Sequence, residues 1–390
     1  MKMIITIVTE TYLPEINGVA MTLGKLVSGL VDAGHVVQLV CPHVEGRKLQ
    51  EGITYHPIKG LPIPRYSEAK FGLPSKKILK NLWSKECPDV IYVATEGPLG
   101  WSAVNLSQKF NIPSVSGFHT NFHSYSQHYG IGLIARIVMK YLVTLHNKSK
   151  MTLTPTEEQK NKLRDMGIKD VSVLSRGVDT NLYSPAKRNI SLRLSWGVVN
   201  EHNPVLLYVG RLAAEKNLNL AIDTYHAMRK KDDSLKFVLV GDGPLLNKLK
   251  RENPDLIFAG IKTGEELAKY YASSDIFVFP SKTETFGNVV LEAMASGLGV
   301  IAYDYAAANM HIKHGVNGMI TNIGNSNEFI FNACEYLDDY VFLENVKISA
   351  SEYTLKNNWS EVSGDFEKLL ANQVVKSFNH QSGLFKGNIV

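Results

Sequence analysis

The sequence predicts an α/β protein built from two doubly wound domains. Short apolar runs typical of strands alternate with stretches typical of helices, and this alternation occurs in two separate series. The strand-like runs are continuously apolar, which indicates parallel sheets covered by helices on both faces. The chain of 390 residues is too long for one ordinary core and suits two.

Each series predicts its elements in order along the chain. The first series is a strand at 3–10, a helix at 19–34, a strand at 35–42, a strand at 89–95, a helix at 97–110 and a strand at 112–119. The second series is a strand at 204–212, a helix to about residue 230, a strand at 235–243, a further helix, a strand at 255–260, a helix at 265–274, a strand at 275–280, a helix after Thr285 and a strand at 299–304. The two series therefore predict two independent parallel sheets.

The linker-like stretch 179–189 sets the predicted domain boundary, because it holds a proline among polar residues. We expect a first domain at 1–185, a second domain at 186–360, and at 361–390 a C-terminal helix and tail, the helix crossing back to the first domain. Ligands of such sheets bind at the carboxyl ends of the strands. We therefore expect two facing domains with the ligand in a cleft between them.

Composition limits the classes of protein that remain. The three cysteines are far apart and odd in number, and the start lacks the features of a signal peptide, so we expect a cytoplasmic protein without disulfides. No apolar run is long enough to span a membrane. The net charge of +5 is uneven: residues 1–185 hold 21 Lys/Arg and 14 Asp/Glu, a balance of +7, and the remainder holds 21 and 23, a balance of −2.

The basic first domain has two explanations. Its lysines and arginines either form ordinary solvated helix faces or lie against an anionic membrane surface, in which case the protein is peripheral on the inner face of the membrane. Nucleic acid is not expected, because the basic residues are not interleaved with stacking aromatic residues. The apolar helix predicted at 132–146 is an ordinary core helix or, as an alternative, a membrane-facing one.

Two cations follow the first strand of the second series. Arg211 and Lys216 stand in a loop that leads into a helix, where charge and free N–H groups favour a diphosphate. The alternative is a surface arginine and a surface lysine. The glycine turn at 240–244 adds only a sharp turn that allows close backbone approach.

An acidic pair brackets a helix start in ETFGNVVLEAMASG, residues 284–297. With a helix beginning near Phe286, Glu284 faces the helix mouth and Glu292 lies about 9 Å along the axis. Carboxylates accept paired hydrogen bonds from vicinal hydroxyls, so one sugar at each glutamate and a diphosphate at the cations describe a nucleotide sugar. The alternative is a helix-terminal charge and a buried ion-pair partner.

These motifs, in this order and spacing, also carry a resemblance. GRLAAEKN, VGDGP and ETFGNVVLEAMASG resemble the nucleotide-sugar domain of retaining family 4 glycosyltransferases of the GT-B fold. ATEGPLGW, GFHTNFHSYSQHYG, SRGVDTNLYSP and YDYAAA are similar to a bacterial subgroup of GDP-mannose-dependent α-mannosyltransferases, several of which act on lipid-linked acceptors. The resemblance covers nearly the whole chain.

The resemblance implies roles for individual residues. Glu284 would contact hydroxyls of the donor sugar, Glu292 the ribose, and Arg211 and Lys216 the diphosphate, while His119 would lie beside the transferred sugar. The remaining implied donor-binding residues are Gly18, Gly210, Gly241, Ile261, Lys262, Phe286, Gly287, Asn288 and Val289. The chain departs from the family at Asn17, where a glycine is common, and at 304–308, where Asp-Tyr-Ala-Ala-Ala replaces a glycine-rich turn.

The expected function is the transfer of a hexose, mannose from GDP-mannose in the first instance, to a lipid-linked or glycan acceptor with retention of configuration. We expect no cofactor and no metal. His119, His123 and His128 are close in sequence, but no carboxylate or cysteine shares their stretch. The alternatives are a UDP-sugar-dependent transferase with a soluble acceptor, a GT-B epimerase and a non-catalytic sugar-nucleotide sensor. An NAD-type oxidoreductase is not expected, because the first strand is not followed by GxGxxG.

Overall fold

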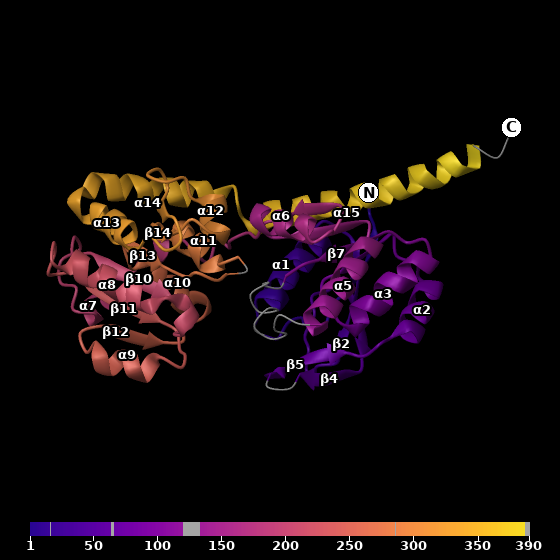
Figure 1. Ribbon diagram of the computed structural model, residues 1–390, viewed down its shortest axis with the longest axis horizontal. Helices are drawn as coiled ribbons and strands as arrows, with labels where there is room; N and C mark the ends of the chain where they lie inside the picture. The colour runs from indigo at the N-terminus through magenta and orange to yellow at the C-terminus, as the bar shows by residue number, and fades with distance from the viewer. Residues whose placement is uncertain (16, 64–65, 120–132, 285, 387–390) are drawn as a thin grey trace. The chain divides into compact units, whose positions relative to one another are not determined.

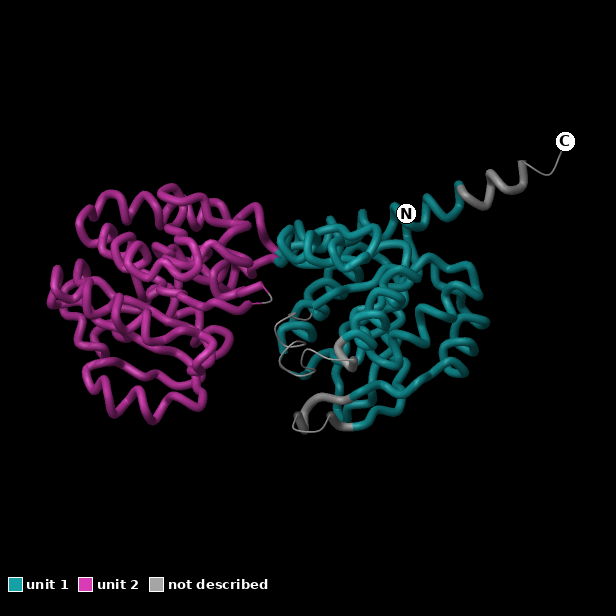
Figure 2. Tube along the Cα trace, viewed as in Figure 1, with its two compact units in different colours: residues 1–176, 359–390 teal, residues 177–358 magenta. Residues whose placement is uncertain are grey.

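The computed structural model describes residues 1–15, 17–63, 66–119, 133–284 and 286–386 of the chain (Figure 1). It divides into two compact units, coloured separately in Figure 2. The first unit comprises Met1–Arg176 and Trp359–Val390, and the second comprises Gly177–Asn358. The polypeptide therefore leaves the first unit once and returns to it once.

The first unit contains a seven-stranded parallel sheet in the order β3-β2-β1-β6-β7-β8-β9. Its strands are β1 (Ile4–Val8), β2 (Val36–Pro42), β3 (Ile53–Ile58), β6 (Val90–Val93), β7 (Ser114–Gly117), β8 (Met151–Thr154) and β9 (Val171–Val173). A separate antiparallel hairpin is formed by β4 (Gly60–Ile63) and β5 (Tyr66–Gly72). The sequence pattern did not predict this hairpin.

Two apolar cores cover the two faces of this sheet. The helices of the unit are α1 (Gly18–Asp32), α2 (Lys76–Lys85), α3 (Pro98–Lys109), α5 (Leu133–Lys148), α6 (Glu157–Asp165) and α15 (Trp359–Lys386). Leu26 of α1 and Phe366 of α15 share one buried cluster with Ile5. Leu79 of α2 and Leu145 of α5 share another cluster with α3. The helix expected at 132–146 is thus a core helix over its second half.

The C-terminal helix α15 is part of the first unit because it packs closely on α1. A Cβ atom at Gly29 of α1 would lie 2.3 Å from the Cβ atom of Ser363, so only glycine permits this approach. The sequence analysis placed the start of the second domain at 186, whereas the second unit starts at Gly177. The earlier start follows from the backbone N–H of Val178, which donates to the carbonyl of Asn357 at 3.1 Å.

The second unit contains a six-stranded parallel sheet in the order β12-β11-β10-β13-β14-β15. Its strands are β10 (Val205–Val209), β11 (Lys236–Val240), β12 (Ile257–Gly260), β13 (Ile276–Phe279), β14 (Gly299–Tyr303) and β15 (Met319–Thr321). Its α-helices are α7 (Ile190–Ser195), α8 (Leu218–Arg229), α9 (Leu246–Glu252), α10 (Gly264–Ala272), α11 (Asn288–Ala295), α12 (Ala306–His311), α13 (Ser326–Asp338) and α14 (Tyr340–Leu355). The fold of two doubly wound parallel-sheet domains is therefore confirmed.

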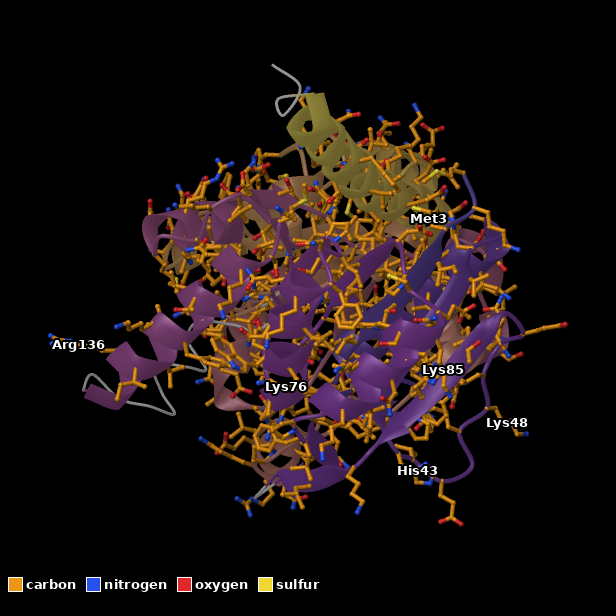
Figure 3. The ribbon with its side chains drawn as sticks, turned by 90° about the vertical axis from the view of Figure 1, so that its right-hand side faces the viewer. Met3, His43, Lys48, Lys76, Lys85 and Arg136 are labelled. Carbon is orange, nitrogen blue, oxygen red and sulfur yellow. The ribbon has the colours of Figure 1, made fainter. Side chains whose placement is uncertain are left out.

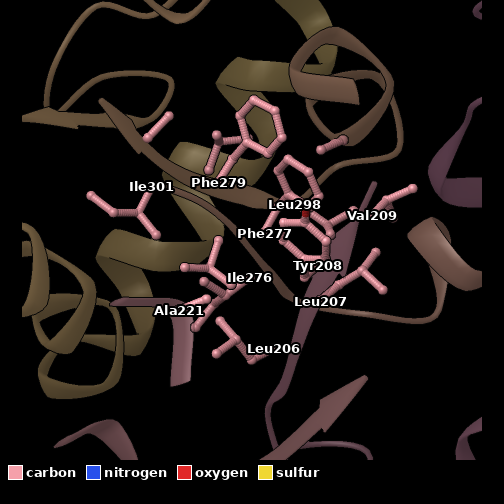
Figure 4. Close-up of a cluster of buried hydrophobic side chains, with 14 of the residues drawn as sticks. Leu206, Leu207, Tyr208, Val209, Ala221, Ile276, Phe277, Phe279, Leu298 and Ile301 are labelled. Atoms are coloured by element: carbon pink, nitrogen blue, oxygen red, sulfur yellow. The ribbon is translucent and has the colours of Figure 1, made fainter. Parts of the chain in front are cut away.

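The central strands of this sheet are fully buried, as their apolar sequences require. Figure 4 shows Leu206, Leu207 and Tyr208 of β10 beside Ile276 and Phe277 of β13 in one continuous core. With both faces covered, side chains that carry chemistry are left to the loops at the strand ends. Among the described residues, no helix is long and apolar enough to cross a membrane.

Candidate functional site

Two glycine loops lie side by side at the carboxyl edge of the second sheet. The N–H of Leu212, after β10, donates to the carbonyl of Asp242, after β11, at 2.9 Å. Gly210 and Gly241 have φ values of 154° and 135°, and a Cβ atom at Gly241 would lie 2.0 Å from the oxygen of Gly210. Glycine is therefore required at 241 for the two loops to meet.

The loop after β10 also carries the two predicted cations. The hydroxyl of Tyr208 donates to the carbonyl of Arg211 at 3.1 Å and so holds the loop backbone. The side chain of Arg211 is 66% exposed, and its guanidinium lies 3.7 Å from Glu215. Lys216 ends the short 3-10 helix η2 (Ala214–Lys216). The structure therefore leaves Arg211 accessible and Lys216 largely shielded from solvent.

Lys216 and Glu284 form a direct ion pair. The Nζ atom of Lys216 lies 2.5 Å from Oε1 of Glu284, and the side chains are only 17% and 15% exposed. Partial burial strengthens such a pair relative to one in open water. The cation that was predicted to bind a diphosphate and the carboxylate that was predicted to bind a sugar are therefore in direct contact.

Helix α11 begins just beyond this ion pair, two residues later than the sequence analysis expected. Gly287, with φ 89°, precedes the first helical residue, Asn288. Gly287 has no side chain and so cannot itself cap the helix N-terminus as a serine or aspartate would. Phe286 is buried, and its carbonyl accepts from the N–H of Ala307 at 2.8 Å. Val289, the second helical residue, is partly buried.

Glu292 lies in the second turn of α11 beside two tyrosines. Its Oε2 atom accepts a hydrogen bond from the hydroxyl of Tyr271 at 2.9 Å. Burial raises the pKa of Glu292 to about 7, and the Tyr271 hydrogen bond opposes that shift. Tyr183 packs edge to face on Tyr271 at 5.6 Å, and burial followed by the charge of Glu292 raises the pKa of Tyr183.

The segment 304–308, which departs from the family pattern, supports the loop that carries Glu284. The hydroxyl of Tyr305 donates to the carbonyl of Glu284 at 3.0 Å. Ala306 adopts φ 52°, a left-handed conformation that favours glycine. An alanine therefore occupies a backbone conformation for which the family's usual glycine is suited.

Ile261 and Lys262 follow β12 at the same edge of the second sheet. The carbonyl of Gly260 accepts from the N–H of Gly241 at 2.9 Å, which ties this loop to the glycine turn. Ile261 is 69% exposed. The Nζ atom of Lys262 lies 2.5 Å from Glu266. An exposed apolar side chain at this edge could pack on a flat ligand group such as a base.

In the first unit, Gly18 is the first residue of α1, and a buried arginine lies next to it. The side chain of Asn17 accepts from the N–H groups of Val19 and Ala20 at 3.1 and 2.9 Å and so caps the helix. A Cβ atom at Gly18 would lie 3.6 Å from Nη1 of Arg176. Burial lowers the pKa of Arg176 to about 10, which leaves it a cation at neutral pH.

His119 follows β7 and contacts the hydroxyl of Tyr92. The Nε2 atom of His119 lies 3.0 Å from this hydroxyl. The pKa of His119 is lowered to about 3, mainly by burial and to a smaller extent by the nearby charges of Arg176 and His146. His119 is therefore neutral at physiological pH. His123 and His128 lie outside the described residues.

Two acids of the first unit, the buried Glu10 and the partly buried Glu96, were not singled out by the sequence analysis. The carboxylate of Glu10 accepts from the N–H of Leu99, at the start of α3, at 3.3 Å. Burial raises the pKa of Glu10 to about 7. Glu96 lies 3.8 Å from His146. Within the described part of the chain, no three His, Cys, Asp or Glu side chains gather as candidate metal ligands.

The signal for the missed residues was weak. In the sequence, Tyr271 and Tyr183 resemble ordinary core aromatic residues, and Arg176 resembles a surface cation. Only the fold brings the two tyrosines to Glu292 and brings Arg176 to the start of α1. The position of Arg176 and Tyr183 inside SRGVDTNLYSP, a motif already quoted, offered a hint for these two residues.

Two doubly wound domains, one of which carries cations and carboxylates on the carboxyl-edge loops of its sheet, define the GT-B class of glycosyltransferases. Solved structures of this class have the same fold. Sucrose-phosphate synthase from Thermosynechococcus elongatus superposes with a TM-score of 0.76 over 96% of this chain and 99% of its own, at 18% identity. The Anabaena protein HepE in complex with UDP gives a TM-score of 0.75 over 95% and 100%, at 20% identity.

Family models match both units. A model described as glycosyltransferase family 4 matches residues 16–182, and one described as glycosyl transferases group 1 matches residues 203–339. A GDP-mannose-dependent α-mannosyltransferase of Corynebacterium glutamicum is 31% identical over 86% of this chain and 80% of its own. One of Mycobacterium tuberculosis is 31% identical over 82% and 84%. An α-monoglucosyldiacylglycerol synthase of Streptococcus pneumoniae is 28% identical over 76% and 70%.

The chain belongs to glycosyltransferase family 4, and it is a hexosyltransferase of the GT-B fold.

Proposed function

We propose that the protein transfers mannose from GDP-mannose to a lipid-linked or glycan acceptor and forms an α-glycosidic bond with retention of configuration. The observation that carries this proposal is the ion pair of Lys216 and Glu284 just before the start of α11. It joins a group suited to a diphosphate to a group suited to sugar hydroxyls. The mannosyltransferase relatives support the choice of donor.

The donor is held by complementary groups of the second unit. Glu292 accepts hydrogen bonds from the ribose hydroxyls, and Arg211 and Lys216 neutralise the diphosphate. The backbone N–H groups from Phe286 to Val289 lie around the helix start, where the helix dipole also favours negative charge. In the first unit, Gly18 lets the backbone approach the phosphate.

Catalysis depends mainly on the leaving group. As the glycosidic bond breaks, negative charge grows on the β-phosphate, and Lys216, Arg211 and the α11 N-terminus stabilise it. The acceptor hydroxyl attacks from the face that the phosphate leaves, and the departing phosphate takes the acceptor proton. His119, neutral and partly buried, contributes to binding of the transferred sugar. No metal or cofactor enters this scheme.

A second candidate is the transfer of glucose or a related hexose from a UDP-sugar. It is favoured by the glucosyltransferase relative and by the fold likeness to a protein that binds UDP. The same residues would serve either donor, because ribose and diphosphate are common to both. The base and the hexose distinguish the two candidates.

We further propose that the protein works at the inner face of the cytoplasmic membrane. Four lysines of α2 are exposed, and the exposed Ile78 lies among them; the lysines are Lys76, Lys77, Lys80 and Lys85. Figure 3 looks onto this side of the first unit and labels Lys76 and Lys85 on α2, with Arg136 on α5. Such a surface suits anionic headgroups.

A panel of nucleotide sugars tests the proposal. GDP-mannose is expected to give GDP release that depends on an added lipid glycoside or glycan acceptor, and NMR of the product is expected to show an α-linkage. Release of UDP from a UDP-hexose, with no release of GDP from GDP-mannose, would establish the second candidate. Interconversion of nucleotide sugars without an acceptor would instead show an epimerase.

A further inference from the structure

The hydrogen bond between Tyr92 and His119 is placed so that its direction can be inferred. Tyr92 belongs to β6 and is fully buried, and its ring packs edge to face on Phe366 of α15 at 4.8 Å. Its hydroxyl lies 3.0 Å from Nε2 of His119. Either group could donate, because a neutral imidazole carries its proton on either nitrogen.

Two observations favour the tyrosine as the donor. Among the described residues, the imidazole is the one hydrogen-bond partner found for this hydroxyl, and a buried O–H without an acceptor is costly. The guanidinium of Arg176 also acts on both groups: burial and the charge of Glu96 raise the pKa of Tyr92 and the charge of Arg176 opposes that rise, while burial and then the charge of Arg176 lower the pKa of His119. A nearby cation attracts the lone pairs of the hydroxyl oxygen, which leaves the proton to point toward the imidazole.

We propose that Tyr92 is a positioning residue for glycosyl transfer: its hydroxyl donates to Nε2 of His119 and fixes the imidazole in the tautomer that carries its proton on Nδ1. The ring then presents Nδ1–H as a donor. The Nδ1 atom is buried and has no hydrogen-bond partner among the described residues. Its acceptor is an oxygen of the transferred sugar, a step that rests on the proposed function of His119.

The backbone beneath this hydrogen bond shows how closely its geometry is set. A Cβ atom at Gly117 would lie 2.3 Å from the Tyr92 hydroxyl oxygen and 2.6 Å from Nε2 of His119. Glycine at 117 therefore leaves the space in which the two side chains meet. Gly117→Ala would displace the pair while keeping both of its members, so it is an independent second variant.

Nitrogen NMR of the histidine side chains in the full chain tests the tautomer, with the His119 signals assigned by their loss in His119→Gln. Wild type is expected to show His119 protonated on Nδ1 near neutral pH, and Tyr92→Phe is expected to lose that preference. Tyr336→Phe is the matched control: Tyr336 is a buried tyrosine of the second unit whose hydroxyl donates to the carbonyl of Val300 at 2.8 Å. It should leave the His119 signals unchanged.

Kinetics test the positioning role. Tyr92→Phe keeps the ring contact with Phe366 and removes one hydrogen bond, so kcat is expected to fall about tenfold with little change in KM for the donor. Gly117→Ala should act in the same direction. Wild type protonated on Nε2, or a tautomer unaltered in Tyr92→Phe, would overturn the hydrogen-bond assignment whether or not the donor is correctly named. A changed tautomer with unchanged kcat would overturn the positioning role.

Discussion

At the scale of single residues, the ion pair of Lys216 and Glu284 couples two predicted functions. Removing the cation takes charge stabilisation from the leaving diphosphate and also leaves Glu284 without its partner. We expect Lys216→Ala to lower kcat/KM at least about a hundredfold. Turnover of Lys216→Ala, Glu284→Ala and the double variant measures this, and the double variant should lose much less than the product of the single losses.

Arg211→Ala provides the comparison for this cycle. Arg211 is exposed and lies outside the ion pair. The fold losses in kcat/KM of Arg211→Ala and Glu284→Ala should therefore multiply in the double variant. Near-normal turnover in both Lys216→Ala and Arg211→Ala would refute the diphosphate assignment.

Variants of the two glutamates should differ in their affinity for a bare nucleoside diphosphate. Glu292→Gln is expected to weaken binding of the diphosphate and of the donor alike, because both contain the ribose. Glu284→Gln should leave diphosphate affinity nearly unchanged and impair transfer, because its partner is the sugar. Calorimetry with GDP and with UDP measures both affinities. Equal losses in the two variants would show that these roles are wrongly divided.

The raised pKa of Glu292 gives this binding a pH dependence. A carboxyl group with a pKa of about 7 is largely protonated at pH 6, and ribose hydroxyls donate best to the ionised form. Binding must then release a proton, so affinity should rise between pH 6 and 8 by up to about tenfold. The ligand phosphate titrates in the same range, so the test is the difference between wild type and Glu292→Gln. A pH profile identical in both would contradict the prediction.

Contacts between individual residues were also the features that the sequence predicted least well. Arg211, Lys216, Glu284 and Glu292 stood out by residue type and spacing, but the direct pairing of Lys216 with Glu284 joins residues 68 positions apart and depends on the folded sheet. The tyrosine that donates to Glu292 stood out by neither spacing nor residue type. Contacts that link separate loops are set by tertiary packing.

At the scale of elements, the apolar runs of the sequence were sufficient to predict the central strands and helices. The run at 204–212 became β10, and the run at 275–280 became β13. The hairpin of β4 and β5 was missed because β4 is only four residues long and contains a proline, and β5 lacks an alternating apolar pattern. The start of α11 was placed two residues early, because Phe286 supports the core as a loop residue rather than as a helical one.

The start of α12 allows a matched test of backbone strain. Ala306 adopts φ 52°, and Ala307, its neighbour, is a helical residue without positive φ. Ala306→Gly relieves the left-handed conformation and should raise the free energy of unfolding by up to about 1 kcal/mol. Ala307→Gly should lower it by about 1 kcal/mol, the usual cost of glycine in a helix. Denaturant unfolding of both variants measures this, and equal destabilisation would contradict the assignment of strain.

At the scale of the whole molecule, the sequence predicted two domains and an uneven charge. The sequence analysis also expected the C-terminal helix to cross back to the first domain, and in the structure α15 belongs to the first unit, where the close approach of Gly29 and Ser363 joins it to α1. These two residues are more than 300 positions apart, so local pattern could not specify which residues of the two helices meet. The first unit thus combines both ends of the chain.

The basic surface of α2 leads to a prediction for the complete protein. Each well-placed lysine contributes on the order of 1 kcal/mol to adsorption on an anionic bilayer. We expect the protein to co-sediment with vesicles that contain anionic lipid, less so as salt shortens the screening length, and far less with neutral vesicles. Replacement of the four α2 lysines by glutamine should abolish most of this binding; they are Lys76, Lys77, Lys80 and Lys85.

A charge-matched variant separates this surface from net charge alone. Four exposed lysines of the second unit serve as the control when replaced by glutamine; they are Lys230, Lys248, Lys269 and Lys313. This control lowers the net charge by the same amount and should keep vesicle binding. Equal loss in both variants would show a non-specific charge effect. No binding to anionic vesicles even at low salt would favour a soluble acceptor and leave the α2 lysines as a solvated helix face.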